Sequence, residues 1–480
     1  MELAKMMITG CAGAVLALGT PAGAQTLHSG DAGFGKQWVR THPFTLEGDS
    51  LYPATWDFAE YFGAGMNTLM KDVGYHHTIN PLNRPSQFAT APWQAILPVP
   101  TGNPQAGITE YNNLRQTPYN VGWIVGDEPT RVRMDDHAAV MSQIRQDNLN
   151  QIAFTTISNN NGPDGIWYGD GAHPNYTYQN YLDDFVSIIR PDVLFYDYYP
   201  FRTDGTTDAK YTQNLMMIRN KALAEGIPYW AWVQGFGLGT SRAPSESDNR
   251  YNVYTHLTAG FTGLVYWTYD YYAGTGNALI DINGNPTAMY DYAKQTNLEA
   301  ANLGKSLRFL TSTDVRFVPG RHQSGIFTTP NDAPLGLTSW SAGAGGDPHL
   351  TDAKVNWNLA GGIGTEKNGL LGLFTDDSGQ DYFMLTNLNH GMDMTAAQTA
   401  LTFTLTFDSQ TNSLLRLDRL TGEQEIVNLV NHQLIWTLPG GTGDLFKYNT
   451  GDFVVPEPAG LGLLAAGMMI ATARGRRDRR

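Results

Sequence analysis

The residues best suited to chemistry are carboxylates that follow short apolar runs. Asp127 and Glu128 come directly after Val121–Gly126, and Asp197 comes directly after Val193–Tyr196. Two carboxyl groups that face each other across a pocket can divide acid and base work, because one donates a proton while the other stays charged. The apolar run before Glu128 is an environment that raises the pKa of a carboxyl group. We therefore expect Glu128 to be the acid, with Asp197 or Asp127 as its partner.

A structural interpretation competes with this one. Acidic residues favour helix N-termini, so Asp127 or Glu128 would cap the helix expected after them. Asp197 would then be a buried side chain that holds loops together through hydrogen bonds.

The elements that position these carboxylates are short apolar runs that alternate with helical patterns up to about Leu310. Alternation of this kind predicts parallel strands, and eight such units predict an α/β fold, a closed (β/α)8 TIM barrel over residues 25–310. The expected strands are Trp38–Phe44, Met66–Asp72, Trp93–Pro98, Val121–Gly126, Gln151–Ile157, Val193–Tyr196, Tyr229–Val233 and Gly263–Thr268. The clearest helical patterns are Met134–Gln146, Tyr178–Ile189 and Tyr211–Ala224.

The second half of the chain has a different texture. Residues 311–453 are rich in Gly, Thr and Asp and contain short segments in which apolar and polar residues alternate, such as Asp381–Thr386, Leu401–Phe407 and Gln433–Leu438. A period of two with frequent turn residues predicts an antiparallel β-sandwich domain after the barrel.

Active sites of such barrels lie at the carboxyl ends of the strands, and polar and aromatic residues gather there in this sequence. Besides the three carboxylates, we expect substrate contacts from Asp72, His76, Asn159, Tyr198, Tyr199, Trp232, Gln234, Trp267 and Asp270. The pair His76-His77 has no third ligand at helical spacing, so no metal site is expected. We also expect no other cofactor, because no glycine-rich phosphate loop is evident.

Composition narrows the class of ligand. The formal net charge of -14 argues against nucleic-acid binding, because an acidic surface repels phosphates. Charged residues are only 16% of the chain while aromatic residues are 11%. Few charges with many Trp and Tyr suit neutral, hydroxyl-rich ligands, since sugar rings stack on aromatic faces. Large aromatic cores explain the same composition equally well.

Both ends carry the pattern of export signals. Lys5, the apolar stretch Met6–Leu18 and Ala22-Gly23-Ala24 have the layout of a signal peptide over residues 1–24. Cleavage there removes Cys11, the only cysteine. At the other end, Pro456-Glu457-Pro458, an apolar run and a group of arginines form a tail over residues 454–480 that resembles the PEP-CTERM sorting signal of Gram-negative bacteria. That resemblance implies an exosortase-type partner, transient membrane contact, and delivery to the cell surface or extracellular matrix; an ordinary tail anchor would also place the body outside the cytoplasm.

The stretch Gly122–Pro129 resembles the strand-four motif of TIM-barrel glycoside hydrolases that carry Asp-Glu-Pro, and Tyr229–Gln234 and Gly260–Thr268 look like their seventh and eighth strands. The resemblance implies an exported enzyme that cleaves glycosidic bonds of a poly- or oligosaccharide with two carboxylates. It departs at Gln234, where the retaining β-glycosidases of this type have a nucleophilic Glu. Two arrangements stay open: Glu128 pairs with Asp197, or, as in hexosaminidases, Asp127 orients a substrate acetamide while Glu128 protonates the leaving group. A surface carbohydrate-binding protein that has lost its nucleophile is the alternative function.

Overall fold

The computed structural model describes residues 27–49, 57–70, 94–116, 120–147, 150–271, 278–324, 327–356 and 367–455. The expected signal peptide, Asp72, His76 and the tail from Pro456 onward lie outside these ranges, so the expectations placed on them stay predictions. None of the described helices is long and apolar enough to cross a membrane.

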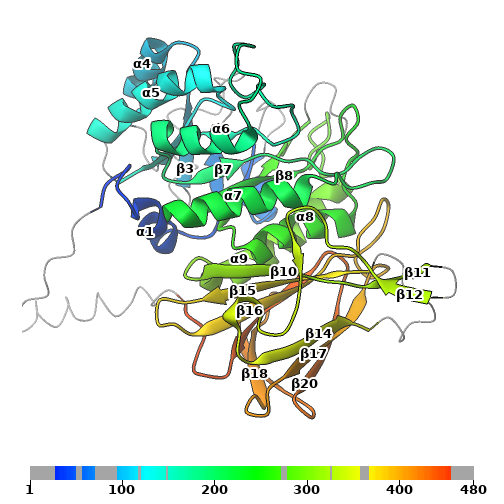
Figure 1. Cartoon of the computed structure of the whole chain (residues 1–480). Coiled ribbons are helices and arrows are strands. Elements are labelled where there is room, and N and C mark those ends of the chain that lie inside the picture. Colours follow the sequence, from blue (N-terminus) through cyan, green and yellow to red (C-terminus); the bar gives the residue numbers. More distant parts are fainter. Residues whose placement is uncertain are drawn as a thin grey trace, which may run out of the picture.

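A nine-stranded parallel sheet forms the first half of the molecule (Figure 1). Its strands pair in the order β5-β4-β3-β2-β1-β9-β8-β7-β6. The two end strands, β5 and β6, are separated only by Thr155, so the sheet curls into a nearly closed barrel. The strands are β1 (Thr45–Gly48), β2 (Thr68–Met70), β3 (Gln94–Val99), β4 (Asn120–Val125), β5 (Ile152–Phe154), β6 (Thr156–Ile157), β7 (Leu194–Tyr196), β8 (Tyr229–Gln234) and β9 (Gly263–Trp267).

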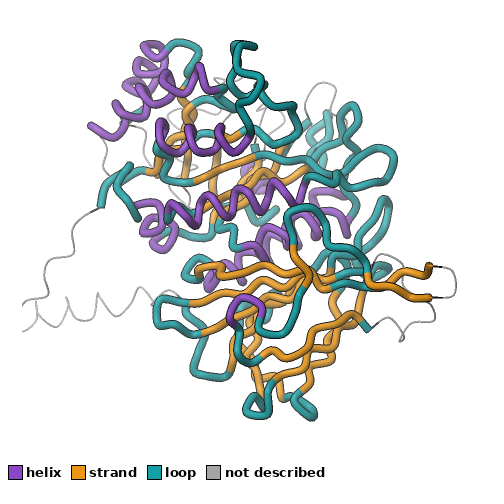
Figure 2. The backbone as a smooth tube through the Cα atoms, viewed as in Figure 1, coloured by secondary structure: helices purple, strands orange, loops and turns teal. Residues whose placement is uncertain are grey.

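Helices surround this barrel on the outside (Figure 2). Side chains alternate along each strand, so one set packs under the helices and the other fills the barrel interior. The interior set includes Ile96, Ile124, Phe154, Phe195 and Trp230. The helices are α1 (Phe34–Thr41), α2 (Phe58–Gly63), α4 (Pro104–Leu114), α5 (Met134–Asp147), α6 (Tyr178–Asp184) with a π-helical turn at Phe185–Ile189, α7 (Tyr211–Glu225), α8 (Glu246–Ala259) and α9 (Ala288–Leu307).

The prediction for the first strand was wrong. Residues Trp38–Phe44 do not form a strand: α1 covers Phe34–Thr41, and β1 begins at Thr45. The helix forms because Phe34, Trp38 and Val39 recur at helical spacing and are buried together. These three side chains join the barrel-interior cluster, where the Trp38 and Trp230 ring centroids lie 5.9 Å apart. The helix therefore closes one end of the barrel.

That end is the amino-terminal face of the strands. Asp192 lies just before β7, and its carboxylate accepts hydrogen bonds from the Ser29 hydroxyl at 2.5 Å and the Gly30 amide at 2.7 Å. Gly35 lies so close to the Asp192 carbonyl that a Cβ atom would stand 1.8 Å from its oxygen. The chain entering α1 is thus fastened below β7, which leaves the carboxyl ends of the strands open for a site.

Residues 311–448, called the β-region here, contain separate and mostly antiparallel sheets that lie beside α8, α9 and the lower barrel (Figure 1). A seven-stranded and a three-stranded sheet share one hydrophobic cluster that includes Phe383, Leu385, Phe403 and Leu405. The strands are β10 (Thr311–Val318), β11 (Arg321–Ser324), β12 (Phe327–Pro330), β13 (Thr338–Ser339), β14 (Leu350–Val355), β15 (Gly369–Thr375), β16 (Asp381–Asn387), β17 (Leu401–Phe407), β18 (Ser413–Leu417), β19 (Gln424–Asn428), β20 (Gln433–Leu438) and β21 (Gly443–Tyr448).

A buried ionic cluster joins the barrel helices to the β-region. Glu299 of α9 accepts hydrogen bonds from two nitrogens of Arg250 on α8, at 2.8 and 3.0 Å, and from the Tyr254 hydroxyl. Arg419, from the loop after β18, also pairs with Glu299 at 3.5 Å. Because both Arg250 and Glu299 are almost fully buried, removing one of them would leave the charge of the other without its closest ionic partner and without access to water.

Candidate active site

Carboxylates from three separate strand ends converge at the carboxyl face of the barrel. Asp49 follows β1, Asp127 and Glu128 follow β4, and Asp197 follows β7. The pKa of Tyr199 is raised well above its ordinary value, first by burial and then by four negative charges, those of Asp197, Asp127, Glu128 and Asp49. All four carboxyl groups therefore lie close enough to Tyr199 to influence its pKa, and three of them are the carboxylates expected from the sequence.

Asp197 and Glu128 form a direct pair. Burial is the main cause that raises the pKa of Asp197 well above its ordinary value, followed by the charge of Glu128, a side-chain hydrogen bond with Glu128 and the charge of Asp127. The Asn159 amide nitrogen lies 3.5 Å from an Asp197 oxygen and acts in the opposite direction. The negative charge of Glu128 disfavours the ionised form of a carboxyl group this close to it, which adds to the effect of burial on the pKa of Asp197.

The turn that carries Glu128 is shaped by glycine. Gly126 has a φ of 65° and Glu128 a φ of 37°, both in the left-handed region. A Cβ atom at Gly126 would lie 2.2 Å from the Thr101 hydroxyl oxygen and 2.5 Å from the His137 ring. Burial lowers the pKa of His137 to about 4, so the ring is neutral when it contacts Thr101 at 3.0 Å. Thr101 and His137 therefore leave no room for a side chain at position 126, so the turn after β4 requires glycine there.

The helix-capping interpretation does not fit Glu128. The helical segment after β4 begins at Arg131, and its N-cap position is Thr130. Glu128 lies two residues earlier, and its side chain is exposed. The expectation that the preceding apolar strand gives Glu128 an apolar environment was therefore wrong, because the side chain is exposed beyond the left-handed turn at Gly126.

A pocket of about 310 Å³ opens beside Glu128. Trp167 is nearly buried in its wall and donates a hydrogen bond from its indole nitrogen to the Asn159 carbonyl at 3.0 Å. The lining residues are Glu128, Pro129, Thr130, Ser158, Asn159, Gly162, Ile166, Trp167 and Tyr181. The expected contact residue Asn159 thus lies between this pocket and the carboxyl pair.

Three aromatic rings stand next to the carboxylates. The Phe236 ring meets Tyr199 edge-on at 4.9 Å and Trp267 edge-on at 4.6 Å, and the Tyr199 and Trp267 ring centroids are 5.6 Å apart. Tyr199 and Trp267 are half-buried. Tyr199 and Trp267 were expected at the site, and they lie together in this aromatic cluster.

Other expected contact residues lie deeper. Gln234 is fully buried: its amide oxygen accepts from the Phe201 amide at 3.1 Å, and its amide nitrogen donates to the Phe236 and Arg242 carbonyls. Trp232 belongs to the barrel-interior cluster, and Tyr198 is 1% exposed with its hydroxyl bonded to Asn161. Asp270 is also 1% exposed. These four side chains are buried in the free protein, so their role as substrate contacts stays a prediction.

Sequence reasoning missed Asp49 and Phe236. Asp49 was overlooked because β1 was placed before its true position; the run Leu46-Glu47-Gly48-Asp49 after Thr45 had the signal of an acidic strand end. Phe236 follows a glycine two residues beyond β8, and nothing in that spacing indicates which way the ring points. The described residues include no group of three or more His, Cys, Asp or Glu side chains that could hold a metal ion.

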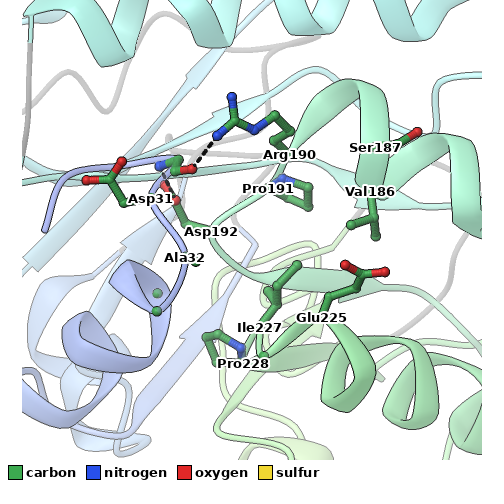
Figure 3. Close-up of a pocket in the computed structure, with 14 residues that line it drawn as sticks. Asp31, Ala32, Val186, Ser187, Arg190, Pro191, Asp192, Glu225, Ile227 and Pro228 are labelled. Atoms are coloured by element: carbon green, nitrogen blue, oxygen red, sulfur yellow. Dashed lines mark hydrogen bonds between the residues drawn. The ribbon is translucent and has the colours of Figure 1, made fainter.

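A second pocket, of about 320 Å³, lies at the opposite face of the barrel (Figure 3). It is bordered by Asp192 and Pro228, which precede β7 and β8, and by the chain entering α1. Arg190 donates to the Gly30 carbonyl there at 2.7 Å. None of the expected site residues lines this pocket, so the carboxyl face is the candidate active site.

No family model and no curated protein matches this chain. Among solved structures, one described as "Glycoside hydrolase" is 12% identical at a TM-score of 0.46, and the match covers 86% of this chain and 94% of the other. A family 5 glycoside hydrolase from Bacteroides vulgatus is 11% identical at 0.45, covering 86% and 91%. An endo-alpha-mannosidase from Bacteroides thetaiotaomicron is 10% identical at 0.38, covering 58% and 84%. Since these TM-scores lie below 0.5, the residues of the site itself must carry the functional argument.

Proposed function

We propose that this chain is a glycoside hydrolase in which the Asp197–Glu128 pair performs acid and base catalysis. The observation that carries the proposal is the contact between these two carboxyl groups, one with a raised pKa, at the carboxyl face of a parallel barrel. Glycosidic bond cleavage needs one protonated and one charged carboxyl group flanking the bond.

The structure favours a different division of roles from the one expected from the sequence. Asp197 has the raised pKa, so it keeps the proton and donates it to the leaving oxygen. Glu128 is exposed at the mouth of the pocket and takes the charged role, either attacking the sugar or activating water. Tyr199 and Trp267 offer ring faces beside the pair for sugar stacking.

The pair is closer in the free protein than catalysis requires. Retaining enzymes hold their carboxyl groups about 5–5.5 Å apart and inverting enzymes about 6.5–9.5 Å apart, whereas these two are within hydrogen-bonding reach. A bound sugar must therefore separate them, and the exposed side chain of Glu128 is the member free to swing outward.

A panel of poly- and oligosaccharides tests the proposal with wild type, Glu128→Gln and Asp197→Asn. We expect turnover of at least one glycan by wild type and a loss of about 10²–10⁴-fold in each variant. Asp135→Asn, at an exposed acid in the first turn of α5, is the matched control and should retain full activity. Binding of a glycan without turnover by all of these proteins would overturn the hydrolase proposal.

That last outcome would favour a second candidate, a surface carbohydrate-binding protein. The specific observation behind it is Gln234, whose amide is committed to three backbone groups at the strand end where retaining enzymes of the resembling type have their nucleophile. Product analysis separates the two functions, because only a hydrolase releases new reducing ends.

We further propose that the chain is exported, with residues 1–24 as a signal peptide and 454–480 as a sorting tail read by an exosortase-type partner. The support is the order of motifs in the sequence. We also infer two domains, 25–310 and 311–453, the second a β-sandwich, from the hydrophobic cluster that its two large sheets share. Mass spectrometry of the protein recovered from its native cell, at both termini, tests the processing.

A further inference from the structure

We propose that His390 of the β-region is a positioning residue for the candidate active site: through Asp248 and Arg242 it holds the two barrel loops that carry Asp197, Tyr199 and Phe236. The inference rests on the proposed function for its catalytic meaning, but the link itself is built from contacts between described residues.

His390 is inserted into the barrel surface. Its Nδ1 atom donates to Asp248 Oδ1 at 2.6 Å, and its Nε2 atom lies 3.3 Å from the Thr207 hydroxyl. The imidazole stacks on Tyr251 at 3.9 Å and meets the Phe201 ring edge-on at 5.7 Å. Both ring nitrogens and one ring face of this β-region residue therefore contact the barrel.

The partner of His390 is a fully buried carboxylate in the first turn of α8. Burial alone would raise the pKa of Asp248, but the hydrogen bonds from His390 and Arg242 lower it below its ordinary value, so the group is charged. The Arg242 guanidinium binds both Asp248 oxygens, and the Ser245 amide donates at 2.9 Å. Removing His390 takes away one of the two side chains that hydrogen-bond to this buried carboxylate.

Arg242 connects Asp248 to the segments that follow β7 and β8. Its carbonyl accepts from the Gln234 amide at 2.8 Å, and its own amide donates to the Phe201 carbonyl at 3.1 Å. The Gln234 amide oxygen in turn accepts from the Phe201 amide, which closes a ring of hydrogen bonds. Arg242 also lies over the Phe201 ring at 5.2 Å.

The loops joined by this ring are the ones that build the site. Phe201 ends the segment after β7 that begins with Asp197 and contains Tyr199. Arg242 belongs to the segment after β8 that contains Phe236, and Phe236 packs against Tyr199. A displacement of Arg242 is therefore transmitted to both the proton-holding carboxyl group and its aromatic neighbours.

Neighbouring β-region contacts strengthen the same attachment. The Gly391 carbonyl accepts from the Ser245 hydroxyl at 2.8 Å, and the Ala396 amide donates to Glu246 at 3.2 Å. These bonds dock the segment after β16 onto the start of α8, where the Ser245 hydroxyl also accepts from the Asp248 amide at 3.2 Å. Of the three β-region residues, His390 is the one that bonds the Asp248 carboxylate directly.

Hydrogen exchange of the full chain tests the link without any substrate. In His390→Ala, we expect amide exchange in segments 197–203 and 235–243 to speed up by roughly tenfold or more, while α5 keeps its protection. His390→Asn should restore most of the protection, because its amide nitrogen can replace the Nδ1 donor. The matched control is His349→Ala, which removes a similar 2.7 Å pair with Asp408 inside the β-region and should leave both loops unchanged.

The outcomes are distinct from those of the glycan panel. Unchanged loop exchange in His390→Ala overturns the positioning role, whatever the panel shows, and so does equal loosening in His349→Ala. Faster loop exchange with a wild type that cleaves no glycan refutes the hydrolase proposal and leaves the link standing. With an active wild type, His390→Ala should lower kcat more than it raises KM, and His390→Asn should recover much of kcat.

Discussion

Replacing Asp197 with Asn removes the carboxyl group on which the proposed chemistry depends while keeping the size of the side chain. The amide can still interact with Asn159, and it ends the repulsion from Glu128 and Asp127 that raises the pKa of Asp197. The variant should therefore fold and lose activity. Its unfolding free energy should also lack the decrease with rising pH that the Asp197 carboxyl group causes in wild type.

The loss of activity follows from the missing proton donor. A positioned general acid contributes about 10²–10⁴-fold to the rate, which corresponds to about 2.7–5.5 kcal/mol of activation free energy. In wild type the reaction needs protonated Asp197, so the rate should fall as the pH rises through the raised pKa of this group. The variant should have no such alkaline limb.

The change in stability has the opposite sign. Because the folded-state pKa of Asp197 is raised, the folded protein keeps its proton at pH values where the unfolded chain has released it. The unfolding free energy of wild type therefore falls as the pH rises from the ordinary pKa of 3.8 toward the raised one, by up to about 1.4 kcal/mol per pH unit. Asn does not titrate, so the variant lacks this contribution and gains on wild type over that window.

Urea denaturation of both proteins between about pH 4 and about pH 7 measures the effect, alongside kcat/KM on whichever glycan the panel identifies. The stability difference should grow in favour of the variant as the pH rises through this range. Parallel stability curves, or a variant that loses stability relative to wild type with rising pH, would refute the raised pKa of Asp197. Full activity in the variant would refute its role as acid.

Three further substitutions test the framework, each by urea denaturation. Glu299→Ala should cost about 3–5 kcal/mol, because it leaves Arg250 buried without its carboxylate; an effect below about 1 kcal/mol would show that the cluster contributes little. Gly126→Ala should cost about 1–3 kcal/mol, since its methyl group collides with Thr101, and it should also lower kcat. Thr177→Ala removes the capping box of α6 and should cost about 1 kcal/mol without affecting activity.

Much of the barrel was predictable because its strands are short, apolar and separated by helical patterns. Strands β4, β7, β8 and β9 lie within two residues of the predicted bounds, as do α5 and α7. The prediction of the first strand failed because the apolar residues of Trp38–Phe44 fit the spacing of a strand as well as that of a helix. Only the joint burial of Phe34 and Trp38, four residues apart, identifies the helix.

The site was predictable where it depends on topology alone. Asp197 and Glu128 meet because parallel strands bring their carboxyl ends to one face, a rule that needs no side-chain detail. Their roles were not predictable, since the exposure of Glu128 after the left-handed turn at Gly126 and the half-buried position of Asp197 depend on the folded backbone. The hydrogen bonds of Gln234 likewise join residues far apart in the sequence, Phe201 and Arg242.

The pairing of β1 with β9 has a consequence for how the chain reaches this structure. Thr45 lies opposite Gly263, so the second edge of β1, the first strand to be synthesised, is covered only when β9, the last strand of the barrel, has been made. Until then β1 exposes unpaired backbone groups that invite association with another chain. A chain cut off before residue 263 should therefore aggregate, and a partner that shields the first strand during synthesis or export would raise the yield of folded protein.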